Sequence, residues 1–267
     1  MKRKSGPKKT AGRKRPIDRL LQLMAQLRSP RGCPWDREQT HESIKRNLIE
    51  ECYEVVDAID SGDDEALREE LGDLLLQIAF HSQIAQEQDR FNFQDVAASI
   101  AQKLRRRHPH VFGEKKLDTA DQVLSQWHAI KKTEKQAPGS VLDGVPKRLP
   151  ALMKAQEIQR KAARVGFDWK STEDVLSKVE EELAELKRAM RRKSVSRIQE
   201  EMGDLFFALV NLARFSRLDA EETLRRAVEK FRGRFERIER ALAEQGKRPE
   251  DCSLEKLEAL WNRTKRK

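Results

Sequence analysis

Apolar residues recur every three or four positions along most of this chain, a spacing that places them on one face of an α-helix. Glycine, proline and aromatic residues are sparse, which argues against a sandwich or barrel of many short strands. The fold class is therefore predicted to be all-α. Helices are expected over residues 17–28, 37–60, 64–89, 93–107 and 119–135, and again over 148–164, 172–192, 195–216, 219–244 and 254–266.

The two groups of helices are separated by a stretch rich in glycine, proline and serine, which begins QAPGSVLDGVP. It predicts a linker over residues 136–147, between an N-terminal module over 17–135 and a C-terminal module over 148–267. The net charge of +10 is concentrated in residues 1–16, which carry eight Lys/Arg and no acid and leave +2 for the remaining 251 residues. This basic segment is predicted to be a disordered tail, either a solubilising arm or a weak nucleic-acid contact.

The two modules repeat one pattern of acidic residues. EExxE is followed by ELGD in the first half and by EMGD in the second, at a constant offset of 131 residues. The carboxylates so matched are Glu51, Glu54, Glu70 and Asp73 in the first half, and Glu182, Glu185, Glu201 and Asp204 in the second. The chain is therefore predicted to be a tandem duplication of one helical module.

In each half, the helical spacing places both carboxylate pairs on one flank of an apolar stripe. If consecutive helices pack through these stripes, four carboxylates converge, and clustered like charges are costly unless cations neutralise them. Oxygen ligands select a hard ion, Mg²⁺ with Mn²⁺ as a substitute, over zinc. The eight matched carboxylates are thus candidate metal ligands. The five histidines show no such repeat and are read as packing or surface residues.

Two further pairs repeat downstream and could bind a nucleotide. A Lys-x3-Arg pair can grip phosphate oxygens, and a Trp-x3-Lys pair offers a ring for base stacking and another cation. These pairs are Lys103/Arg107 and Trp127/Lys131 in the first half, and Lys230/Arg234 and Trp261/Lys265 in the second. No Walker or Rossmann glycine motif competes with this interpretation.

Cellular location is constrained by two further observations. The longest uncharged stretch, Leu74–Gln86, has 13 residues, which is too short to span a bilayer. The three cysteines form no CxxC pair and no even-numbered disulfide framework. A cytoplasmic protein without membrane contact is expected.

Five motifs together resemble the MazG nucleoside triphosphate pyrophosphohydrolases of the all-α NTP pyrophosphatase superfamily. They are GCPWD at 32–36, the acidic set ending at Asp73, RRHPHVF at 106–112, VGFDW at 165–169 and the acidic set ending at Asp204. The resemblance implies Mg²⁺-dependent hydrolysis of (deoxy)nucleoside triphosphates to the monophosphate and pyrophosphate, in a nucleotide-pool house-cleaning role. It also implies a homodimer whose four-helix cores are completed by dimerisation.

The resemblance also assigns roles within the second half. Water would attack the α-phosphorus, with Glu181 and Glu182 as the candidate bases and Lys230 stabilising the developing charge. Lys178 joins the residues expected to contact the nucleotide. The competing hypothesis is a non-catalytic helical module that binds nucleotides or nucleic acid. It predicts that deleting the basic tail abolishes function whereas Asp204→Asn does not.

Overall fold

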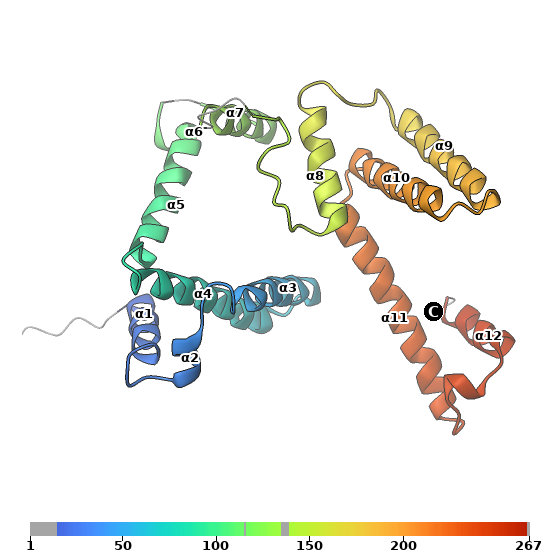
Figure 1. Cartoon of the computed structure of the whole chain (residues 1–267), viewed down its shortest axis with the longest axis horizontal. Coiled ribbons are helices and arrows are strands. Elements are labelled where there is room, and N and C mark those ends of the chain that lie inside the picture. The colour runs from blue at the N-terminus through green and yellow to red at the C-terminus, as the bar shows by residue number, and fades with distance from the viewer. Residues whose placement is uncertain (1–14, 115, 135–138, 266–267) are drawn as a thin grey trace, which may run out of the picture. The chain divides into compact units, whose positions relative to one another are not determined.

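The computed structural model describes residues 15–114, 116–134 and 139–265, and these residues form helices and loops without a strand (Figure 1). The chain divides into two compact units, residues 1–136 and 137–267. The described part of the first unit contains α1 (Pro16–Leu27), α2 (Pro34–Glu38), α3 (Lys45–Ser61), α4 (Asp64–Gln86), α5 (Phe93–Arg107), α6 (Pro109–Phe112) and α7 (Ala120–Thr133). That of the second contains α8 (Ala151–Ala163), α9 (Thr172–Arg191), α10 (Val195–Phe215), α11 (Ala220–Ala243), the 3-10 turn η1 (Pro249–Asp251) and α12 (Leu254–Thr264).

The all-α prediction is confirmed, but one expected helix is divided. The segment expected as a single helix over 37–60 forms α2 and α3, with an extended residue, Gln39, after α2. Thr40 and Ser43 exchange hydrogen bonds between their side chains and backbone amides, which favours a turn over a continuous helix. The sequence pattern also missed α6, a single turn that starts at Pro109, where the missing N–H carries no cost.

Each unit is built around an antiparallel helical hairpin. In the first unit α3 packs on α4, and Gly62, at φ 68°, ends α3 in the left-handed conformation that glycine tolerates. Asp63 then caps α4 by accepting hydrogen bonds from two backbone amides. In the second unit α9 packs on α10, and Ser171 and Asp174 form a capping box at the start of α9. These hairpins carry the two acidic motifs.

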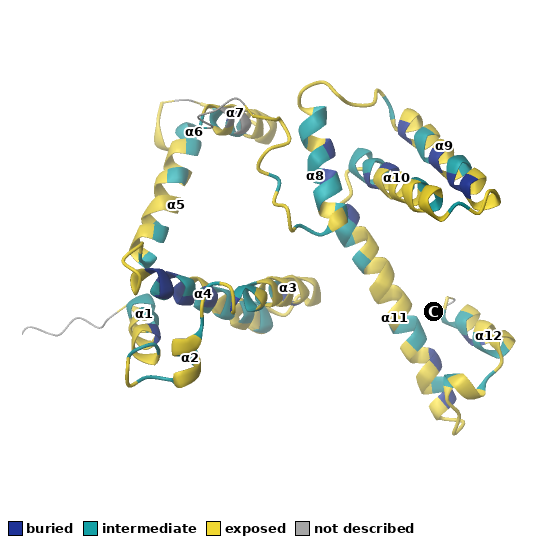
Figure 2. Ribbon diagram, in the orientation of Figure 1, coloured by how far each residue is buried: buried dark blue, intermediate teal, exposed yellow. Residues whose placement is uncertain are grey.

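The buried cores are small and lie beside the hairpins (Figure 2). In the first unit Met24, Ile44, Phe80 and Ile84 form one cluster, and Leu76 packs against it. In the second unit α8 packs on α10 and α11, while Ile238, Leu242 and Leu260 join α11 to α12. None of the described helices is long and apolar enough to cross a bilayer.

The hairpin of the second unit leaves large apolar side chains uncovered. Leu183 on α9 and Met202, Phe206 and Leu209 on α10 are all exposed. The first unit repeats this feature, with exposed apolar residues on α3 and α4 that include Ile49, Tyr53, Val56 and Leu71. Contiguous exposed apolar surface of this kind marks an interaction site in a protein that folds in water.

Candidate metal and nucleotide site

The predicted acidic residues come together in both units. Glu182, Glu201 and Asp204 each place a carboxylate oxygen within 4.8 Å of the others, and Glu51, Glu70 and Asp73 do the same in the first unit. The outer members of the two motifs, Glu54 and Glu185, fall outside these groups of three. Glu54 lies near enough to raise the pKa of Glu51 and Glu70 through its charge. Glu185 pairs with Arg188 at 2.7 Å.

The two clusters are stabilised differently. In the second unit the ammonium of Lys178 lies 2.7 Å from Glu182 and 3.1 Å from Glu181, and these two carboxylates raise its pKa. Glu182 is 5% exposed, so it lies closer to the buried face of α9 than a residue on the flank. In the first unit Asn47 stands where the second has Lys178, and Glu51 instead accepts a hydrogen bond from Gln77 at 3.3 Å.

The electrostatics of both clusters favour a cation. The pKa of Glu201 is raised by desolvation first and then by the charge of Glu185. Glu51 shows the same order of causes, with burial followed by the opposing hydrogen bond from Gln77 and the charges of its neighbours. Burial raises the pKa of Glu70 as well. Carboxylates that raise one another's pKa form a site whose repulsion a divalent ion would relieve.

The predicted cationic and aromatic residues also meet within each unit. The guanidinium of Arg107 on α5 lies 5.0 Å from the ring centre of Trp127 on α7, and that of Arg234 on α11 lies 5.7 Å from Trp261 on α12. Trp261 also packs against Phe231 at 5.0 Å. Among the described residues, no hydrogen bond or ion pair links these four residues, or Lys103, Lys131, Lys230 and Lys265, to the carboxylates of the clusters.

Arg107 and Arg234 differ in their ionic partners. Arg107 donates to Glu134 at 3.1 Å through Nε, and Arg106 bonds the same carboxylate at 2.7 Å, which lowers the pKa of Glu134 to about 2. For Arg234, no carboxylate of the described residues lies within ion-pair distance. A phosphate can therefore approach Arg234 without displacing an anion of the described chain.

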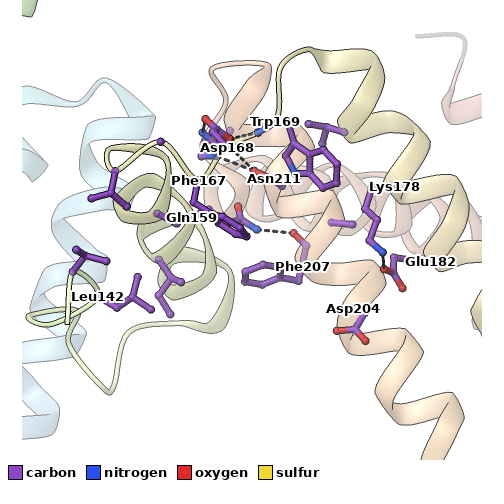
Figure 3. Close-up of a pocket in the computed structure, with 18 of the residues that line it drawn as sticks. Leu142, Gln159, Phe167, Asp168, Trp169, Lys178, Glu182, Asp204, Phe207 and Asn211 are labelled. Carbon is purple, nitrogen blue, oxygen red and sulfur yellow. Dashed lines mark hydrogen bonds and ion pairs between the residues drawn. The ribbon is translucent and has the colours of Figure 1, made fainter.

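The structure adds a cavity that the sequence did not indicate. It measures about 760 Å³, is lined by α8, α9, α10 and the loops before α8 and α9, and includes Lys178, Glu182 and Asp204 in its wall (Figure 3). Asp168, from the VGFDW motif, pairs with Arg214 of α10, which holds the loop before α9 against the cavity. The motif pointed to this loop, but nothing in the sequence singled out Gln159 and Asn211, which also line the wall.

Some predicted residues have other contacts. His41 and His81 stack with ring centres 5.1 Å apart, and His108 meets the edge of Trp127, so these histidines pack as expected. Residues 1–14 of the basic tail and part of the predicted linker, residues 136–138, lie outside the described residues. The three cysteines are free.

Fold and site together define a class: an all-α protein of two helical modules, each carrying a carboxylate cluster suited to a metal ion. The model of the MazG nucleotide pyrophosphohydrolase domain matches residues 39–112 and 170–238, one segment in each unit. The chain belongs to the MazG family.

Relatives of nearly equal length support this assignment. The chain is 48% identical over 255 residues to the nucleoside triphosphate pyrophosphohydrolase of Escherichia coli K12, covering 94% of this chain and 97% of that protein. It is 47% identical to the nucleoside triphosphate pyrophosphohydrolase/pyrophosphatase MazG of Thermotoga maritima, covering 93% and 95%. The identity to the nucleoside triphosphate pyrophosphohydrolase of Mycobacterium tuberculosis H37Rv is 38%, covering 85% of this chain and 60% of that one.

Proposed function

We propose that this protein hydrolyses nucleoside triphosphates to the monophosphate and pyrophosphate, with Mg²⁺ as cofactor and Mn²⁺ as a substitute. The observation that carries the proposal is the cluster of Glu182, Glu201 and Asp204, whose oxygens approach within 4.8 Å beside a cavity large enough for a small molecule. Relatives of similar length carry the name nucleoside triphosphate pyrophosphohydrolase.

The donor set fits magnesium. Carboxylate oxygens are the ligands that Mg²⁺ prefers, and an ion with few protein ligands keeps waters and binds phosphate oxygens directly. Glu182, Glu201 and Asp204 would hold the ion, with Glu185 beside them. When bound, the ion supplies a Lewis acid that polarises the phosphate and lowers the pKa of water.

Protein groups next to the ion would handle the proton and the phosphate charge. We assign the proton from the attacking water to Glu181, because Glu182 is committed to the ion and Lys178 holds the two carboxylates side by side. Lys230, Arg234 and Lys265 would bind phosphate oxygens and stabilise the charge that develops on them. Trp261 would assist by its contact with Arg234.

A homodimer would complete this site. The exposed apolar residues of α9 and α10 need a partner surface, and a second copy of the same hairpin would bury them in a four-helix core. In the same way, a second copy could bring cationic residues to carboxylates that they do not contact within one chain. A cytoplasmic location, where nucleotide pools are accessible, stays a prediction.

Product analysis tests the activity directly. The protein is incubated with ATP, dATP or dUTP, with and without Mg²⁺, and the products are separated by ion-exchange chromatography. We expect monophosphate and pyrophosphate, with both products lost when the metal is removed or when Asp204→Asn is used. Intact triphosphate under all conditions would refute the proposal and favour the non-catalytic binding module.

A further inference from the structure

The cavity of the second unit has a polar end and an apolar end. Lys178, Glu182 and Asp204 lie together at one end, while Leu142, Gln159 and Phe167 lie toward the other (Figure 3). Its volume of about 760 Å³ falls within the roughly 300–1,000 Å³ usual for small-molecule sites. A ligand in it would therefore have an apolar part in the cavity and an anionic part at the metal cluster.

The aromatic side chains of the wall lack protein cover. Phe167 is 83% exposed, Phe207 is 46% exposed and Trp169 is 42% exposed, although all three line the cavity. Aromatic rings at such a site provide stacking surfaces for a flat ligand, and base stacking on them tolerates any base.

Two amides fix the polarity of hydrogen bonding in the wall. Gln159 is 6% exposed, and its Nε2 donates to the backbone carbonyl of Phe207 at 2.8 Å. Its Oε1 is buried and has no partner among the described residues, so it is an acceptor awaiting a donor. The Oδ1 of Asn211 accepts from Arg214 at 2.9 and 2.7 Å, which leaves the Nδ2 of Asn211 as a donor.

We propose that this cavity binds the nucleobase of the triphosphate whose phosphates lie at the Glu182 cluster, an inference that rests on the proposed function. The rings of Phe167, Trp169 and Phe207 stack on the base. Gln159 accepts from, and Asn211 donates to, the polar edge of the base, which every nucleobase can match with one donor and one acceptor. Trp261 then holds Arg234 for the phosphates and does not carry the base.

The first unit has no equivalent space, because larger side chains and a cation fill it. Phe80 stands at the position of Asn211, and it is 5% exposed in a cluster with Met24. The guanidinium of Arg28 lies 5.3 Å from the Phe80 ring centre. At the matching positions the first unit therefore has a packed core where the second has a cavity, and base recognition is assigned to the second unit alone.

Binding measurements on the full chain test the assignment without relying on turnover. The ligands are α,β-methylene-dATP, which resists hydrolysis, and methyl triphosphate, which has no base, each titrated calorimetrically in Mg²⁺. Asn211→Phe, which copies the first unit, and Ala162→Phe, from the α8 wall, fill the cavity from two sides. Ala151→Phe, at the exposed start of α8, is the matched control.

We expect both filling variants to weaken α,β-methylene-dATP binding at least about 10-fold, while methyl triphosphate binding stays within about 3-fold of wild type. Gln159→Met, which removes the acceptor at similar volume, is expected to weaken the nucleotide about 5- to 30-fold. The control should match wild type with both ligands. Unchanged methyl triphosphate binding also shows that each variant is folded at the cluster.

Three results would overturn the assignment. They are equal losses for both ligands, no loss for either, and wild-type binding of the nucleotide no tighter than that of methyl triphosphate. A lower sedimenting mass with unchanged affinities would identify the cavity as a contact between copies, which also refutes it. If wild type binds the nucleotide but does not cleave dATP, the proposed function fails and the binding data still decide the role of the cavity.

Discussion

The ammonium of Lys178 lies 2.7 Å from the carboxylate of Glu182, which is 5% exposed, so a buried ligand of the cluster already has a cationic partner. Before a divalent ion binds, this ammonium compensates part of the negative charge. The matching carboxylate of the first unit, Glu51, has a neutral amide in that role. The two clusters therefore differ in charge although their carboxylates match.

Replacing Lys178 should destabilise the metal-free protein. In Lys178→Met the buried Glu182 loses its charged partner, so we expect the free energy of unfolding to fall by about 1–3 kcal/mol. The difference should shrink in saturating Mg²⁺, because the ion then neutralises the same carboxylate. Urea denaturation with and without Mg²⁺ measures both quantities. Lys187→Met, an exposed change on the same helix, is the control, and equal losses in the two variants would contradict the prediction.

Asp204 and Asp73 should contribute unequally to turnover. Because the second unit has the cavity and the first has a packed core at the matching positions, we expect Asp204→Asn to lower kcat at least about 100-fold and Asp73→Asn to lower it less than about 2-fold. Steady-state rates of dATP hydrolysis for the two variants provide the comparison. Similar losses would show that both clusters catalyse the reaction.

Glu201 should destabilise the metal-free fold as the pH rises. Its pKa in the folded state is raised, chiefly by burial, so the folded protein binds the proton more tightly than the unfolded chain does. Stability is then lost as the pH rises from the ordinary value of 4.5 through the raised pKa. We expect Glu201→Gln to melt at a higher temperature than wild type at neutral pH without metal, while it binds Mg²⁺ more weakly. A lower melting temperature for the variant would contradict this sign.

The pair His41 and His81 should sensitise the first unit to acid. Burial lowers the pKa of both rings, and the charges of Arg90 and Arg28 lower that of His41 further. A depressed folded-state pKa means that stability is present above the ordinary value of 6.5 and is lost as the pH falls through the folded values. His81→Gln should flatten this pH dependence in melting experiments between about pH 7 and pH 5. An unchanged pH profile would show that the ring pair does not control it.

The sequence predicted the helices and the two acidic clusters because both follow from short-range periodicity. Glu182, Glu201 and Asp204 converge because each lies at a fixed angle from an apolar stripe, and hairpin packing brings the angles together. Periodicity could not show that Thr40 and Ser43 would prefer each other's backbone to a continuous helix.

The cavity could not be predicted in the same way. Its existence depends on the volumes of side chains that come from α8, α9 and α10 and meet only after folding. The single difference between Phe80 and Asn211 acquires meaning once both residues are known to face the same space in their units. Gln159 looked like any helical glutamine, because an unpaired buried oxygen has no signature in sequence.

The pairing of Arg107 with Glu134 has a consequence for the first unit. A carboxylate with a pKa of about 2 stays ionised at every physiological pH, so it competes with any incoming phosphate for the same guanidinium. The first unit thus carries its own tethered competitor, present at a constant effective concentration that no change in nucleotide supply can dilute. Binding of a triphosphate there would require exchange of one anion for another, whereas at Arg234 it would require only the displacement of water.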